Sequence, residues 1–166
     1  MQQERDDSST GGVPLRASIY GEHVPRILRT SLPDGFFHVT ARGVDGAAIV
    51  RDRGDGQHYV HLLARTIERY RWECHAYCLM PNHMHAVVDA TRADVSAGVQ
   101  YLHGMYALDF NRRHGRSGHL FGARFASWVV ETEQHLVNAC RYVYLNPVRA
   151  GLCARPQDWP WSGIRS

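Results

Sequence analysis

The chain is organised around one short stretch, Tyr77-Cys78-Leu79-Met80-Pro81-Asn82-His83-Met84-His85-Ala86-Val87-Val88. Apolar runs rich in β-branched and aromatic residues stand on both sides of Pro81-Asn82, and a Pro-Asn pair between two such runs is typical of a tight turn. The stretch therefore predicts a β-hairpin. Because side chains alternate faces along a strand, His83 and His85 should share one face of the second strand, with Met84 on the other.

The histidine pair is the first candidate for chemistry. Two imidazoles two residues apart on a strand converge on one point above the sheet, and neutral imidazole is the commonest metal ligand in proteins. A bare His-x-His pair by itself fits rather better with two histidines that merely face solvent or a neighbouring strand. This stretch alone leaves both interpretations open.

The rest of the chain predicts one small α+β domain. A strand is expected over 36–42, followed by a helix over 57–72, the hairpin and a helix over 95–113 capped by Asp94. A short strand over 125–130 and a last helix complete the order; this helix begins near Glu133 and ends at about Asn146, because Pro147 cannot continue it comfortably. This order fits the split β-α-β (ferredoxin-like) plan, a small antiparallel sheet with helices on one face. The two histidines are then expected on the opposite, free face.

Length and composition limit the class of protein. The 166 residues suffice for one domain, which we expect over 25–166 after a polar, disordered arm over 1–24. No apolar run approaches the ~20 residues of a membrane span, and the start of the chain has no apolar signal-peptide core. The four cysteines form no Cys-x-x-Cys pair. These features predict a cytoplasmic protein with reduced thiols and no membrane partner.

The basic residues are informative by type. All 19 are arginine, and the formal net charge is +3. Without lysine, a P-loop and a Schiff-base mechanism are excluded. Gene base composition can produce such a bias on its own, yet every cation still offers a planar fork that matches phosphate.

A basic loop follows the second long helix. The segment 111–125 holds four arginines and no acidic residue, together with two phenylalanines. Basic groups interleaved with aromatic side chains suit a phosphate backbone and unstacked bases, which favours nucleic-acid binding over an ordinary solvated loop. The candidate contacts are Arg112, Arg113, Arg116, His119, Phe121 and Arg124.

The last helix has two distinct faces. Its apolar stripe consists of Leu136, Cys140 and Val143, whereas Asn138, Tyr142 and Asn146 fall at i, i+4 and i+8 on a polar face. A tyrosine one turn from an asparagine could complete a site with the histidine pair. The same spacing also fits a half-buried tyrosine that packs and keeps its hydroxyl in water.

These motifs resemble a known family. The stretch 77–85 resembles the histidine-hydrophobe-histidine (HUH) motif of single-tyrosine transposases. The segments 111–125, 140–152 and 158–162 are similar to the REP-associated tyrosine transposase branch of bacteria. The resemblance runs from about residue 25 to the end, with several separate motifs in the right order.

The resemblance implies a set of roles. His83 and His85 match the metal-binding histidines, and Tyr142 matches the nucleophile because the family's tyrosine stands five residues before the proline of an Asn-Pro pair. Asn146 matches a third, side-chain amide ligand, and the implied cofactor is Mg²⁺ or Mn²⁺. Such enzymes cut single-stranded DNA beside a folded hairpin and keep the 5′ phosphate as a phosphotyrosine.

The resemblance also implies partners and a location. Hairpin or single-stranded DNA would contact the basic loop and Arg42, and the protein would act in the bacterial cytoplasm at the nucleoid. A monomer with its tyrosine in cis is favoured, although relatives include dimers that exchange the tyrosine helix. The sequence departs from the family pattern at 43–46, at 122–124 and at Ala126, where lysine is common, so these positions bear on which DNA sequence is recognised.

Two other functions stay open at this point. One is a DNA-binding protein of the same fold that has lost strand transfer. The other is a metal-dependent phosphodiesterase in which water attacks the phosphate and Tyr142 only packs. Retention of cleavage after replacement of Tyr142 by phenylalanine would identify the second.

Overall fold

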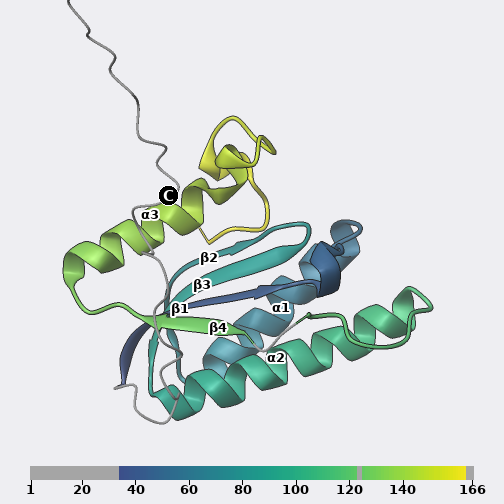
Figure 1. The fold of residues 1–166 in the computed structure, drawn as a ribbon, viewed down its shortest axis with the longest axis horizontal. Coiled ribbons are helices and arrows are strands. Elements are labelled where there is room, and N and C mark those ends of the chain that lie inside the picture. Colours follow the sequence, from purple (N-terminus) through teal and green to yellow (C-terminus); the bar gives the residue numbers. More distant parts are fainter. Residues whose placement is uncertain (1–33, 123–124, 164–166) are drawn as a thin grey trace, which may run out of the picture. The chain divides into compact units, whose positions relative to one another are not determined.

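The structure, a computed structural model, describes residues 34–122 and 125–163. A four-stranded antiparallel sheet has the strand order β2-β3-β1-β4 (Figure 1). Its strands are β1 (Gly35–Arg42), β2 (Glu73–Leu79), β3 (His83–Ala90) and β4 (Ala126–Val129). With one helix after β1 and one after β3, this order confirms the predicted α+β, split β-α-β plan. The predicted arm over 1–24 lies outside the described residues.

Three α-helices cover the sheet, and they do so from both sides. Helices α1 (Arg53–Arg69) and α2 (Arg92–Arg113) pack on one face, where they share a core with Phe37 and Met84. Helix α3 (Glu133–Arg149) packs on β2 and β3 from the other face, in a smaller core around Val87 and Val143 (Figure 1). The expectation that all helices share one face was therefore wrong: α3 covers part of the face expected to be free.

Two short 3-10 helices, η2 (Val44–Gly46) and η3 (Pro156–Asp158), complete the described elements. Across residues 34–122 and 125–163, no helix has the length and apolar character that crossing a membrane requires.

The predicted hairpin forms, and its turn is tied to the neighbouring loop. The Met80 N–H donates to the His83 carbonyl oxygen at 2.8 Å, which closes the turn between β2 and β3. The Pro81 carbonyl accepts from the backbone N–H groups of Ile49 and Val50 at 2.8 and 3.0 Å. The Asn82 backbone carbonyl accepts from the Gly43 N–H at 2.9 Å. The position of the turn is therefore fixed by backbone groups of the segment after β1.

Helix starts differ from the prediction by up to one turn. Helix α1 begins at Arg53 because Asp52 caps it, with its carboxylate accepting from the Asp55 N–H at 3.0 Å. The cap of α2 is Thr91, whose hydroxyl accepts from the Asp94 N–H at 3.1 Å. Asp94 was predicted as that cap and instead lies within the first turn.

Helix α3 does not end at Asn146, as predicted, but continues through Pro147 to Arg149. A proline so near a helix end removes only one backbone hydrogen bond. Beyond it, the Ala150 and Leu152 N–H groups donate to the carbonyls of Asn146 and Pro147 at 3.0 and 2.9 Å. The helix stops where Gly151 takes a left-handed conformation, with φ +70°, which glycine adopts without strain.

Two glycines of α2 provide a matched test of this packing. A Cβ at buried Gly98 would lie 2.4 Å from Cζ2 of Trp72, whereas a Cβ at Gly104 would meet nothing within 4 Å. We expect Gly98→Ala to lower the free energy of unfolding by about 1–3 kcal/mol, because overpacking outweighs the helix propensity of alanine. Gly104→Ala should raise it by about 0.5–1 kcal/mol. Urea unfolding measures both, and equal stabilisation by the two variants would contradict the packing described.

Candidate active site

The structure brings the four residues predicted for catalysis and metal binding together between β3 and α3. The ring centroids of His83 and His85 are 5.0 Å apart, with the rings perpendicular at 89°. The Tyr142 ring lies edge-on to His85, with centroids 5.6 Å apart. The Asn146 side chain, one turn after Tyr142, lies beside the His83 ring and opposes the lowering of its pKa by burial. Residues about 60 positions apart in sequence therefore share one small volume.

A third histidine, not predicted from the sequence, completes this group. His38 of β1 is only 2% exposed, and its Nε2 lies 3.1 Å from Nδ1 of His85. Its ring centroid is 6.1 Å from that of Tyr142. The alternation of β1 places His38 on the same sheet face as His85, but only the neighbouring position of β1 and β3 reveals the contact.

Hydrogen bonds fix the orientation of the two predicted metal-binding histidines. The Asn82 amide donates through Nδ2 to the Gly46 carbonyl at 3.2 Å, so its Oδ1 faces Nδ1 of His83 at 2.7 Å. An amide oxygen only accepts, so the His83 proton is on Nδ1 and Nε2 keeps its lone pair. The contact with His38 likewise engages Nδ1 of His85 and leaves Nε2 of that ring for a ligand.

The protonation of these histidines follows from their burial. Burial lowers the pKa of His85 to about 3, assisted by the neighbouring His38 and His83, and lowers that of His38 to about 4. Burial also lowers the pKa of His83. All three rings are therefore neutral at pH 7, the form in which imidazole binds a metal ion. Two neutral imidazoles and the amide of Asn146 make a donor set that fits a divalent cation.

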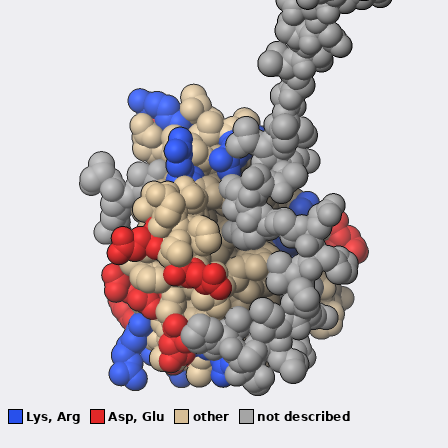
Figure 2. Space-filling model, turned by 60° about the vertical axis from the view of Figure 1, so that its left-hand side comes forward, with Lys and Arg blue, Asp and Glu red and all other residues tan. Residues whose placement is uncertain are grey.

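Exposed arginines stand beside this group. The Arg149 guanidinium lies over the Tyr142 ring, with Cζ 5.1 Å from the centroid. Arg42 pairs with His83 across β1 and β3, and its charge contributes to the lowered pKa of that histidine. Figure 2 shows arginine side chains at the top of the view and others at its lower edge, with the acidic side chains at middle height and below. Two cations thus flank the tyrosine and the histidine pair.

Arg149 is not among the predicted site residues, because the predicted last helix ends at about Asn146. It follows Tyr142 by seven residues, which is two helical turns, so the two side chains share a face only if the helix continues through Pro147. The continuation seen in α3 is therefore what adds this cation to the site.

The predicted DNA contacts of the basic loop are of two kinds: exposed side chains, and side chains that lie against aromatic rings. Arg112 is exposed and pairs with Asp109 at 2.8 Å, and His119 is exposed. The Phe121 ring stacks on His103 with centroids 4.1 Å apart. The Arg116 guanidinium lies 5.7 Å from the Phe110 ring centroid. Arg124 lies outside the described residues.

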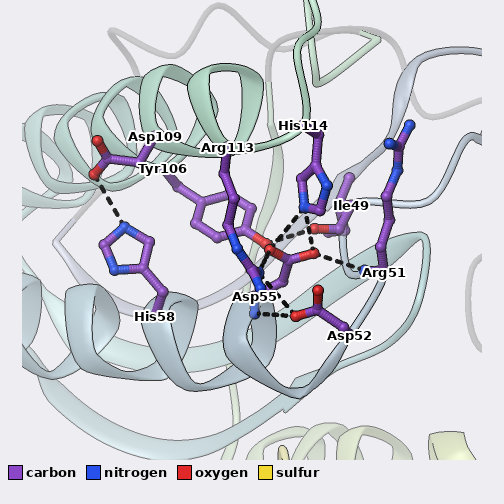
Figure 3. Close-up of polar contacts among 9 residues, drawn as sticks. All are labelled: Ile49, Arg51, Asp52, Asp55, His58, Tyr106, Asp109, Arg113 and His114. Atoms are coloured by element: carbon purple, nitrogen blue, oxygen red, sulfur yellow. Dashed lines mark hydrogen bonds and ion pairs between the residues drawn. The ribbon is translucent and has the colours of Figure 1, made fainter.

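Arg113 has a different environment from that expected. Its guanidinium donates to Asp52 at 2.8 Å and to Asp55, which is only 2% exposed (Figure 3). His114 also contacts the Asp55 carboxylate, at 2.9 Å. The positive charge of Arg113 thus neutralises carboxylates of its own chain and joins the end of α2 to the start of α1.

This cluster is also a candidate metal site by composition. One ligand atom each from Asp52, Asp55 and His114 lie within 4.8 Å of one another. Arg113 already donates to both carboxylates, and its single charge offsets one of them. Asp55 further accepts from the backbone N–H of Arg51 at 2.9 Å. The cluster lies in the α1–α2 layer, on the sheet face opposite α3. Local sequence patterns do not predict it, because its parts are about 60 positions apart.

Comparison with known proteins identifies the class. The family profile described as "Transposase IS200 like" matches residues 37–146, so the chain belongs to the IS200-like transposase family. A candidate REP-associated tyrosine transposase of Haemophilus influenzae is 27% identical over 111 residues, which cover 60% of this chain. The match spans 63% of the length of that relative. The resemblance found in the sequence is thus confirmed for the family.

A solved structure shares the fold. It is the structure of a REP-associated tyrosine transposase bound to a REP hairpin, with a TM-score of 0.63 and 20% sequence identity. The match covers 80% of this chain and 78% of that one. At this level of identity, the likeness shows the fold alone.

The histidine beside the basic loop predicts a pH dependence of stability. Burial lowers the pKa of His103 from 6.5 to about 4, and its Nε2 lies 3.3 Å from the Tyr59 hydroxyl. Below pH 6.5, His103 takes up a proton in the unfolded chain, whereas in the folded chain it stays neutral until about pH 4. The free energy of unfolding should therefore fall with decreasing pH, by about 1.4 kcal/mol per pH unit for this one proton.

Urea unfolding between pH 7 and pH 5 measures this slope. We expect His103→Phe, which retains a ring against Phe121, to lower the slope by about one proton, whereas His119→Phe at an exposed position should not. An unchanged slope in His103→Phe would contradict the assignment.

Proposed function

We propose that this protein is a metal-dependent transposase that binds single-stranded, hairpin-forming DNA and cleaves and rejoins strands through a 5′-phosphotyrosine on Tyr142. The observation that carries the proposal is the position of Tyr142 on α3, edge-on to His85 and beside the His83–Asn146 contact. Membership of the IS200-like family supports the same reaction class.

The metal ligands in this proposal are His83, His85 and Asn146. Bound Mg²⁺ or Mn²⁺ would withdraw charge from the non-bridging phosphate oxygens and hold the phosphorus in line with the attacking oxygen. Two imidazoles tilt the preference towards Mn²⁺. Asn82 and His38 orient the two rings from behind, a role that commonly determines metal affinity.

The chain's own residues account for the strand transfer. The Tyr142 hydroxyl gives up its proton as its oxygen attacks the phosphorus. The bond from phosphorus to the 3′ oxygen breaks, and that oxygen takes up one proton and leaves as a 3′ hydroxyl. Attack by another 3′ hydroxyl on the phosphotyrosine then releases Tyr142 and joins two strands, without an external energy source. Arg149 and Arg42 stand where they can hold the phosphates on either side.

The proposed partner is a REP-like hairpin, because a protein of the same fold was solved with a REP hairpin. Arg112, Arg116, His119, Phe121 and Arg124 remain proposed DNA contacts, and Arg113 is left out because two carboxylates already bind it. The proximity of Tyr142 to the histidine pair within one chain supports a monomer. We place its action on bacterial DNA in the cytoplasm.

Covalent trapping tests the nucleophile. Incubation with hairpin DNA from the flanks of the gene and Mn²⁺ should yield a protein-linked DNA band in denaturing electrophoresis, and Tyr142→Phe should abolish it. Tyr144→Phe is the matched control, because the Tyr144 hydroxyl donates to the His75 carbonyl at 2.7 Å and lies on another side of α3. The Tyr144 variant should retain the adduct.

The two alternatives give different results in the same assay. Cleavage that leaves no protein-linked DNA and persists in Tyr142→Phe would identify a phosphodiesterase that uses water. Binding of the hairpin without cleavage would identify a DNA-binding protein that has lost strand transfer. Either result would refute the proposed mechanism.

Metal titration tests the ligand set without relying on activity. We expect His83→Ala to abolish Mn²⁺ binding measured by calorimetry, and His38→Phe to weaken it by about 10-fold or more, because His85 loses its orienting partner. His38→Gln, whose amide oxygen can accept from the same nitrogen, should recover part of the affinity. Asp52→Asn, in the other cluster, should bind Mn²⁺ as the unmodified protein does. Loss of binding in Asp52→Asn alone would place the metal among Asp52, Asp55 and His114.

A further inference from the structure

We propose that Trp128 is a stacking platform for an unpaired base of the DNA strand next to the phosphate that Tyr142 attacks. The inference rests on the proposed function and adds to it the position of one nucleotide. Trp128 was not among the residues that the sequence analysis selected.

Strand pairing places Trp128 beside the candidate active site. In the β1–β4 pair Trp128 is opposite His38, and in the β1–β3 pair His38 is opposite Val87. Directly paired residues share a sheet face, so Trp128 lies on the face that carries His85. The Trp128 and His38 ring centroids are 5.8 Å apart. One ring, that of His38, therefore separates the indole from Tyr142.

The exposure of Trp128 is unusual among the aromatic residues. It is 37% exposed, and every other tryptophan, tyrosine or phenylalanine in residues 34–122 and 125–163 is buried or half-buried. The indole of Trp128 is therefore the most accessible aromatic side chain of the described residues.

The surroundings suit one chemical class of ligand. Helix α3 packs on β2 and β3, whereas Trp128 is on the edge strand β4 at the other end of the sheet. Arg42, four residues after His38 and exposed, presents a cation on the same face of β1. An aromatic side chain and an arginine on the same sheet face suit single-stranded nucleic acid, with a base stacked on the ring and a phosphate further along the strand on the cation.

Such a platform would add affinity without adding sequence preference. Every base has a π face, so an indole accepts any of them, whereas a base held in a duplex cannot stack on it. Trp128 would therefore favour an unpaired nucleotide over a paired one next to the cleaved phosphate. The recognised sequence would be set elsewhere, by the hairpin contacts.

The test compares two probes with the same phosphate backbone. Fluorescence anisotropy gives the affinity of the full chain for a single-stranded 15-mer of thymidine and for a 15-mer in which every base is replaced by an abasic site. The unmodified protein should bind the thymidine probe more tightly, and Trp128→Ala should lose at least about fivefold for that probe and little for the abasic probe. Trp128→Phe should keep part of the preference. Leu108→Ala, an exposed apolar position on α2, is the control that should change neither affinity.

Three results would overturn the inference: equal binding of the two probes by the unmodified protein, unchanged thymidine binding in Trp128→Ala, or an equal loss for both probes. Adduct formation on saturating hairpin DNA separates this test from the proposed function. If the adduct forms but the unmodified protein binds the thymidine and abasic probes equally, only the role of Trp128 is refuted. A base preference lost in Trp128→Ala, with no adduct in any variant, would retain the platform and refute the transposase mechanism.

Discussion

The register of β3 is the constraint on which the candidate site depends. This strand lies between β1 and β2, and its alternation sends Met84, Ala86 and Val88 into the core under α1 and α2. His83 and His85 consequently face α3. A slip of one residue would bury both histidines in that core and turn three apolar side chains toward α3, so burial of one face specifies the orientation of the other.

Helix α3, which faces the histidines of β3, supplies the other side chains of the candidate site. Because it continues through Pro147, Tyr142, Asn146 and Arg149 fall on successive turns of one face. The polar face thus gives a hydroxyl, an amide and a guanidinium to one small volume beside two neutral imidazoles. Few groups are involved, and each is oriented by a neighbour: His83 by Asn82, His85 by His38, and the Tyr142 ring by contact with His85 and Arg149.

Much of this arrangement was accessible from the sequence, and the remainder was not for identifiable reasons. The hairpin, the order of strands and helices, and the proximity of Tyr142 to Asn146 follow from local periodicity. The positions of His38 and Trp128 beside the candidate site depend on the order of strands in the sheet, which pairs the two residues across β1 and β4. The position of α3 on the second face and the pairing of Arg113 with buried Asp55 depend on packing between distant segments, which counts of charge and apolar residues do not reveal.

The central claim is that Tyr142 becomes covalently linked to DNA, and mass spectrometry of the trapped adduct tests it most directly. Because Arg141 precedes Tyr142 and the next arginine is Arg149, trypsin releases residues 142–149 as one peptide that contains both Tyr142 and Tyr144. After nuclease digestion, fragment ions of this peptide should place a nucleotide 5′-phosphate on Tyr142. A phosphate on Tyr144, or an unmodified peptide from protein that has cleaved its DNA, would contradict the account.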